Sequence, residues 1–204
     1  MIKEQLLQEQ LKKIITKVEI NLPHGSMDEI LLSKKIYRQK NWQSRLLHFD
    51  EIASGLFIDL FTQVLQKSEI ESVKIFLFNN NQVNYTTTTK VNNRTIEDIF
   101  LLNNMGEILN NDMDRIAEVI ASSIIITNKD LNFVVIIDSE REFYYFYGDE
   151  SFIKDISSFT FDEYKSYYDN LCDFAKDNLE YLKVEYLKWF WGTYINDREI
   201  HSIV

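Results

Sequence analysis

The histidines and the cysteine are the side chains best suited to bind a transition metal or to act as nucleophiles, but their spacing favours neither role. His24, His48 and His201 are far apart and form no i+4 or His-x-His pair, although such pairs are typical of metal sites. Cys172 is the only cysteine and has no histidine close to it in the sequence. We interpret it as a small packing residue on a helix and expect no metal site.

Phosphate-binding and hydrolase motifs are also missing from the sequence. There is no Gly-x-Gly-x-x-Gly, no Gly-Lys-Ser/Thr and no Gly-x-Ser-x-Gly, and the five glycines are widely scattered, at positions 25, 55, 106, 148 and 192. Backbone loops that hold a phosphate or expose a nucleophilic serine need glycines at fixed short spacings. We therefore expect no nucleotide cofactor, no catalytic residue and no enzymatic activity.

Carboxylates gather where two apolar strands are expected to end. Asp138, Glu140 and Glu142 follow the run 133–137, a position from which metal nucleases hold Mg²⁺. No lysine follows within the strand, so a polar hairpin turn is the simpler interpretation. Asp149 and Glu150 follow the next strand and suit the start of a short helix, where acidic residues offset the helix dipole.

A second group of acidic residues repeats along a helix expected over residues 160–191. Its members recur at spacings of seven, four, four and three: Asp162, Asp169, Asp173, Asp177 and Glu180. Such spacings place side chains in one stripe on a helix. Two interpretations remain open: an ordinary solvated face, and a negatively charged ridge that binds a basic partner.

The aromatic run 143–147 alternates between the two faces of a strand. One set of rings belongs to the core, and the other is either covered by a helix or presented to a partner. Tyrosine beside carboxylates is typical of protein-binding surfaces. The candidate partner-binding residues are Asp138, Glu140, Glu142, Tyr145, Tyr147, Asp149, Glu150, Asp169, Asp173 and Asp177.

The balance of charge disfavours a generally basic nucleic-acid-binding protein. The 204 residues include 22 basic and 32 acidic side chains, a net charge of −10, which repels nucleic acid. Residues 1–48 nevertheless carry nine basic and five acidic side chains, and we expect this arm to lie on the acidic body. The alternative function is a nucleic-acid-associated regulator, in which the basic segment 34–45 contacts phosphates while Tyr37 and Trp42 stack on bases.

Hydrophobic periodicity predicts one α+β domain over residues 1–204. Its parts are a helical N-terminal part (1–68), strands with two short helices (72–148) and a long C-terminal helix (160–192). We expect helices over residues 3–18, from the Ser26/Glu29 capping box to Arg38, and from Asp50 to Leu65. The expected strands are 72–78, 83–91, 124–127, 133–137 and 143–147, in an antiparallel sheet of four to five strands. Short helices are expected at 95–102 and 112–122, and a capping box at Thr160 and Glu163 opens the long helix.

The sequence also indicates a cytoplasmic protein. The segment from Met1 to Gln8 lacks the apolar region and cleavage site of a secretory signal. The longest apolar runs, 133–137 and 143–147, are far shorter than the ~20 residues of a membrane span. A lone cysteine agrees with a reducing compartment.

The stretch from Phe133 to Glu150 reads FVVIIDSEREFYYFYGDE. It is similar to a hairpin that recurs in bacterial immunity proteins, which neutralise toxin domains of contact-dependent inhibition and related polymorphic toxin systems. The small size, acidic charge, single cysteine and lack of catalytic motifs also resemble that class. The resemblance implies tight, stoichiometric binding to a cognate, basic toxin domain, at its active site or on a neighbouring surface.

Overall fold

The computed structural model describes residues 2–53, 55–79, 81–101, 123–138, 143–157, 159–178 and 180–195. The first half holds α1 (Ile2–Ile14), β1 (Ile15–Leu22), β2 (Gly25–Leu32), α2 (Lys34–Gln39), β3 (Gln43–His48), α3 (Phe49–Ala53), α4 (Leu56–Lys67), β4 (Ser72–Asn79), β5 (Gln82–Lys90) and α5 (Asn93–Phe100). The second half holds β6 (Ser123–Thr127), β7 (Phe133–Asp138), β8 (Phe143–Gly148), α8 (Glu150–Ile156), α9 (Phe161–Asp177), α10 (Tyr181–Phe190) and a π-helical turn, η1 (Trp191–Ile195).

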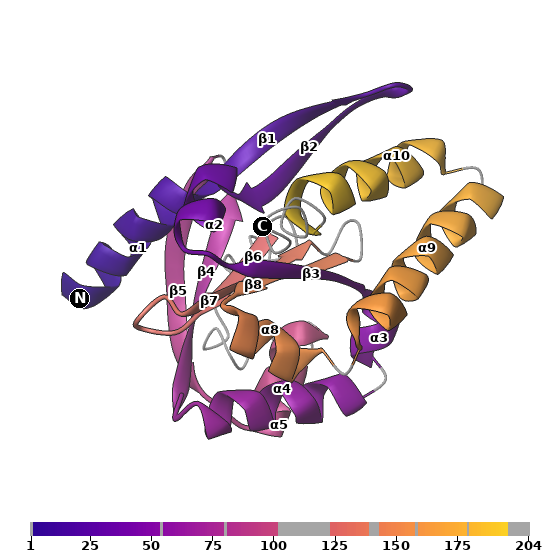
Figure 1. The fold of residues 1–204 in the computed structure, drawn as a ribbon. Coiled ribbons are helices and arrows are strands. Elements are labelled where there is room, and N and C mark those ends of the chain that lie inside the picture. Colours follow the sequence, from indigo (N-terminus) through magenta and orange to yellow (C-terminus); the bar gives the residue numbers. More distant parts are fainter. Residues whose placement is uncertain are drawn as a thin grey trace.

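The described strands form one six-stranded antiparallel sheet and a separate hairpin. The sheet order is β3-β8-β7-β6-β4-β5, and β1 pairs only with β2. Helices α4, α5 and α8 lie on one side of the sheet, whereas the β1–β2 hairpin and α10 lie on the other (Figure 1). Every residue of β7 and β8 is buried, because both faces of the sheet are covered.

Aromatic rings fill both layers beside the sheet. On one face, Phe146 of β8 packs against Phe57 of α4 at a ring separation of 5.2 Å, and Phe100 of α5 stacks on Tyr144 at 5.7 Å. On the other face, Tyr145 packs against Phe190 of α10 at 5.4 Å. The fold therefore uses both halves of the aromatic run as core.

The helices predicted near the N-terminus are wrong between Ile15 and Leu32, whereas the end of the second one, towards Arg38, is confirmed as α2. Residues 15–32 form an antiparallel hairpin whose register runs from Ile15 opposite Leu32 to Leu22 opposite Gly25. Ser26 and Glu29 therefore lie on β2 and do not cap a helix. The apolar spacing that continues the helical pattern past Ile14 also permits strand alternation, and pairing with residues 25–32 decides between them.

Strand β3 was not predicted, so the expected four to five strands become six. Its sequence, QSRLLH, has no clear alternation, and it lies at the edge of the sheet, where it pairs only with β8 among the described strands. The helix expected from Asp50 to Leu65 is divided into α3 and α4 at Gly55, which has a φ of 77°, a conformation that glycine adopts readily.

The capping box at Thr160 and Glu163 is confirmed, but the long helix is not. Thr160 Oγ1 accepts a hydrogen bond from Glu163 N at 3.3 Å, and Glu163 Oε2 accepts one from Thr160 N at 2.7 Å. The helix ends at Asp177, with Asn178 as its C-cap, and α10 folds back against α9 (Figure 1).

The remaining predicted elements agree with the structure or lie outside the described residues. All five predicted strands are confirmed, as β4 to β8. The helix expected at 95–102 is α5, capped by Asn92, whose Oδ1 accepts a hydrogen bond from Thr95 N at 3.0 Å. The helix expected at 112–122 lies outside the described residues. Within the described part of the chain, no helix has both the length and the apolar character that a membrane span needs.

Candidate protein-binding surface

Tyr145 and Tyr147 were expected at a partner surface, and the structure shows that this is wrong. Both side chains are fully buried, and burial raises the pKa of each hydroxyl well above its ordinary value. Tyr145 donates a hydrogen bond to Glu29 at 3.3 Å, and Tyr186 donates one to Tyr145 at 2.9 Å. Strand alternation separates two sets of rings, but it does not reveal that both faces of the sheet are covered.

The carboxylates of the expected 138–150 surface do not form one exposed patch. Asp138 is buried within β7, so it is wrong as a partner-binding residue. Glu140 and Glu142 lie outside the described residues. Asp149 and Glu150 are exposed, but at the opposite end of β8 from Asp138.

Asp149 has a structural role that the sequence predicted. Its Oδ1 accepts hydrogen bonds from Phe152 N and Ser151 Oγ, both at 2.8 Å, and so caps α8. Glu150 occupies the first turn of the same helix, where a negative charge is favourable. This end of β8 is therefore a helix start.

The acidic stripe of α9 is exposed. Asp169, Asp173 and Asp177 face solvent, on the side of the helix opposite the buried Tyr164 and Tyr168. None of the three carboxylates forms an ion pair with a described cation within 4.0 Å. Glu180, by contrast, lies beyond the end of α9 and pairs with Lys183 at 3.4 Å.

Two further exposed aromatic side chains, which were not predicted as partner-binding residues, lie on the same two helices as these carboxylates. Phe174 on α9 is 63% exposed, and Tyr181 at the start of α10 is 50% exposed. Phe174 lies off the buried stripe of α9, which is the signal that could have found it. Asp169, Asp173, Asp177, Glu180, Phe174 and Tyr181 together are called the acidic ridge below.

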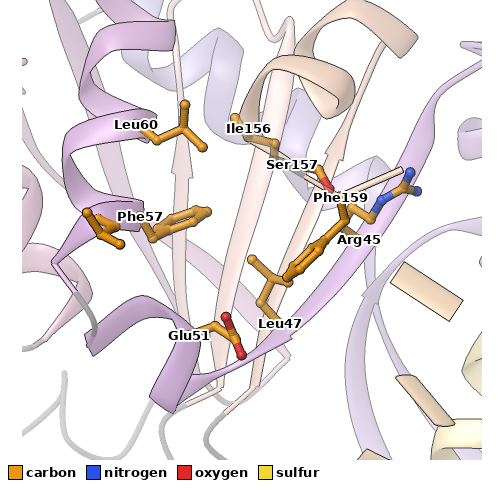
Figure 2. Close-up of a pocket in the computed structure, with 9 residues that line it drawn as sticks. Arg45, Leu47, Glu51, Phe57, Leu60, Ile156, Ser157 and Phe159 are labelled. Atoms are coloured by element: carbon orange, nitrogen blue, oxygen red, sulfur yellow. The ribbon is translucent and has the colours of Figure 1, made fainter. Parts of the chain in front are cut away.

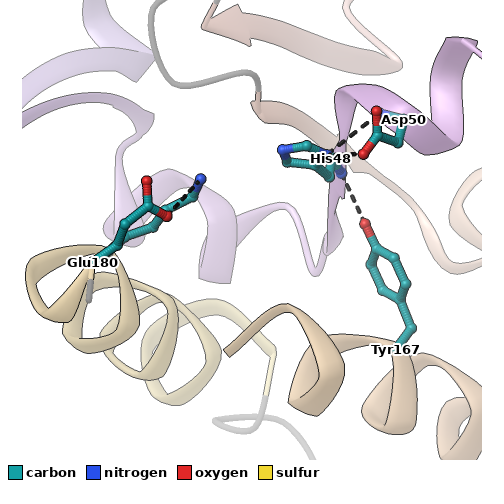
Figure 3. Close-up of polar contacts among 5 residues, drawn as sticks. His48, Asp50, Tyr167 and Glu180 are labelled. Carbon is teal, nitrogen blue, oxygen red and sulfur yellow. Dashed lines mark hydrogen bonds and ion pairs between the residues drawn. The ribbon is translucent and has the colours of Figure 1, made fainter. Parts of the chain in front are cut away.

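Two tyrosines of α9 form hydrogen bonds with the edge strand β3 and so fix the orientation of the ridge. The hydroxyl of Tyr164 accepts a hydrogen bond from Leu46 N at 2.8 Å and donates one to Leu46 O at 3.0 Å. The hydroxyl of Tyr167 accepts one from His48 N at 2.8 Å (Figure 3). Because this face of α9 is held against the sheet, the carboxylates on the other face point outward.

A histidine–aspartate contact lies at the end of β3. His48 Nδ1 is 3.3 Å from Asp50 Oδ2 and also accepts a hydrogen bond from Asp50 N at 3.4 Å (Figure 3). The two residues are only two positions apart, and Asp50 is exposed. The contact therefore stabilises the turn from β3 into α3, and we assign it no catalytic role.

The aromatic side chains of the basic segment 34–45 are not accessible for stacking on nucleic-acid bases. Tyr37 and Trp42 are both buried. The Tyr37 hydroxyl donates to the backbone of Tyr194, and Lys40 lies 4.6 Å from the centre of the Trp42 ring. The two rings expected to stack on bases are therefore part of the core.

Neither metal-ligand geometry nor similarity to a known protein identifies a function. No group of three or more His, Cys, Asp or Glu side chains among the described residues could hold a metal ion. No family model, curated protein or solved structure matches the chain. The acidic ridge is therefore the surface feature from which a function can be inferred.

Proposed function

We propose that the protein binds and neutralises a basic protein, in the manner of a bacterial immunity protein with its toxin domain, and that the acidic ridge is the binding surface. The observation that carries this proposal is the exposed row Asp169, Asp173 and Asp177, which forms no ion pair with a described cation within 4.0 Å, together with two exposed aromatic rings on α9 and α10. An immunity role is the specific form that the sequence resemblance suggests.

The row of carboxylates is unfavourable for the isolated protein. Asp169 and Asp173 are four positions apart, as are Asp173 and Asp177, and like charges at this spacing destabilise a helix by about 0.2–0.5 kcal/mol per pair. Asp177 is the last residue of α9, where the negative end of the helix dipole disfavours a further negative charge. A basic partner would relieve both effects.

The exposed rings provide apolar contact area, which the carboxylates do not. Charged groups at the rim of an interface mainly raise the association rate, whereas large aromatic side chains anchor it. Phe174 follows Asp173 directly in the sequence and Tyr181 follows Glu180, and all four side chains are exposed. The ridge thus combines long-range attraction for a basic surface with two apolar contacts that can be desolvated on binding.

The test is neutralisation of a toxin encoded next to this gene. Each neighbouring reading frame is expressed in a heterologous host, alone and with this protein, and growth is measured. We expect one neighbour to arrest growth and this protein to restore it. The triple variant Asp169→Lys/Asp173→Lys/Asp177→Lys should lose the rescue and bind the purified neighbour with a slower association rate.

A matched control separates the ridge from total charge. The variant Glu19→Lys/Glu97→Lys/Asp130→Lys changes the net charge by the same amount at exposed positions elsewhere, and it should rescue growth as well as the unaltered protein. Equal rescue by both triple variants would refute the ridge as the binding surface. Absence of any toxic neighbour that the protein counteracts would refute the immunity role.

A further inference from the structure

A pocket of about 310 Å³ lies between the edge strand β3, helices α3 and α4, and the segment after α8 (Figure 2). Its volume is at the lower end of the range for small-molecule sites. Its walls are mostly apolar: Leu47, Leu56, Phe57, Leu60, Ile156 and Phe159. Leu56 is 78% exposed, so apolar surface at the pocket remains in contact with water.

The cation in this pocket is Arg45, whose hydrogen bonding is incomplete. Its Nη1 donates to the carbonyl oxygen of Ser44 at 2.9 Å, and its Cζ lies 4.5 Å from the centre of the Tyr164 ring. Among the described residues, its buried Nε has no hydrogen-bond partner, and no carboxylate lies within 4.0 Å of the guanidinium. Burial lowers the pKa of Arg45, as expected for a charge that is partly desolvated without a counter-ion.

A second polar group lies close to Arg45. The hydroxyl of Ser157 is buried and has no hydrogen-bond partner in the part of the chain that the structure describes, and Arg45, Ser157 and Phe159 lie at the same side of the pocket (Figure 2). Buried polar groups without partners are unusual and need an explanation. A carboxylate supplies acceptors for both groups and fits the planar donor arrangement of a guanidinium.

The other residues that line the pocket restrict the charge and the polarity of its ligand. Glu51 lies at another wall, near Leu47 (Figure 2), and its charge opposes a ligand with more than one anionic group. Phe57 and Leu60 face Arg45 across the pocket from α4 (Figure 2). The environment therefore suits a single negative charge at the Arg45 end and a hydrocarbon body at the other.

We propose that this pocket binds a small amphipathic monocarboxylate, with the carboxylate at Arg45 and Ser157 and the hydrocarbon against Phe57 and Leu60. This site is separate from the acidic ridge, and the proposal does not depend on the proposed function. The ridge requires a basic protein, whereas this pocket requires a small anion with an apolar body.

The test is isothermal titration calorimetry of the full chain with octanoate, 1-octanol and octylamine. Octanoate should bind at one site per chain, with a dissociation constant of about 1 mM or tighter. Octanol should bind at least about tenfold more weakly, because it lacks the charge-assisted hydrogen bonds. Octylamine should not bind measurably. Equal affinity for octanoate and octanol, or no octanoate binding, would overturn the proposal.

Variants locate the site. Arg45→Gln should weaken octanoate binding about tenfold or more while leaving octanol binding unchanged, and Arg94→Gln, at an exposed position on α5, should change neither. Leu60→Phe narrows the pocket and should weaken both ligands, which keeps the test valid if Arg45→Gln fails to fold. Octanoate binding that survives Leu60→Phe in a folded protein would place the ligand elsewhere and refute the site.

Discussion

Asp173→Lys should make the isolated protein more stable. Asp173 repels Asp169 and Asp177, each four residues away on the exposed face of α9, and each repulsion costs about 0.2–0.5 kcal/mol. A lysine replaces two repulsive pairs with two attractive ones and has a higher helix propensity than aspartate, whereas its repulsion of Lys176, three residues away, offsets part of this gain. The free energy of unfolding should therefore rise by about 1 kcal/mol at low ionic strength, which corresponds to about 2–4 °C in Tm for a chain of this length.

The origin of this gain can be tested by varying salt and by a double-mutant cycle. Urea denaturation at about 0.01 M salt should show the full gain, and at about 1 M salt only the contribution of helix propensity should remain, because the Debye length falls from about 30 Å to about 3 Å. In an Asp169→Asn/Asp177→Asn background the same substitution should gain less, since its neighbours no longer carry charge.

The same substitution should weaken binding of the basic partner while it stabilises the free protein. Such opposite effects are expected where a surface is kept for function at the expense of stability. If Asp173→Lys lowers the free energy of unfolding, or raises it by an amount that does not depend on salt, then charge repulsion along α9 does not destabilise the free protein.

Three further predictions concern other parts of the molecule. Tyr164→Phe should lower the free energy of unfolding in urea by about 1–3 kcal/mol, because it leaves a buried N–H and C=O of β3 without partners; a loss below about 0.5 kcal/mol would contradict the role given to this hydroxyl. Burial raises the pKa of Cys172 to about 11, so iodoacetamide should alkylate it at about pH 8 at least tenfold more slowly than a free cysteine, and the rate should rise up to about pH 11 as thiolate forms. Replacing Lys34, Lys35 and Arg38 by Glu should lower the Tm if the basic arm lies on the acidic body, and an unchanged Tm would exclude that arrangement.

The parts of the fold predicted from sequence are those in which local chemistry and tertiary packing agree. The β-branched and aromatic runs at 72–78 and 133–137 became strands β4 and β7, and the Thr160 cap opens α9. The hairpin at 15–32 and the strand β3 were missed because pairing with distant segments decides their conformation. Local periodicity carries no information about such partners.

The same distinction between local pattern and tertiary packing applies to the residues of the candidate site. The spacing of Asp169, Asp173 and Asp177 correctly predicted one exposed stripe, since helical periodicity alone fixes which residues share a face. The prediction for Tyr145 and Tyr147 was wrong because their exposure depends on whether other elements cover that face of the sheet. The β1–β2 hairpin and α10 do cover it (Figure 1). Phe174 lies off the apolar stripe of α9, so its exposure could have been predicted from helical periodicity, whereas the exposure of Tyr181 depends on the helix break at Asn178, which periodicity does not reveal.

The contacts along β3 bear on how this protein avoids self-association. Strand residues at a sheet edge carry backbone groups that can recruit another chain, and on β3 such groups on Ser44, Leu46 and His48 bond instead to the side chains of Arg45, Tyr164 and Tyr167. Two of these three side chains belong to α9. Transient detachment of α9 would therefore uncover a growth site for intermolecular β-pairing, so the rate of aggregation should follow the local opening of this one helix and can precede global unfolding.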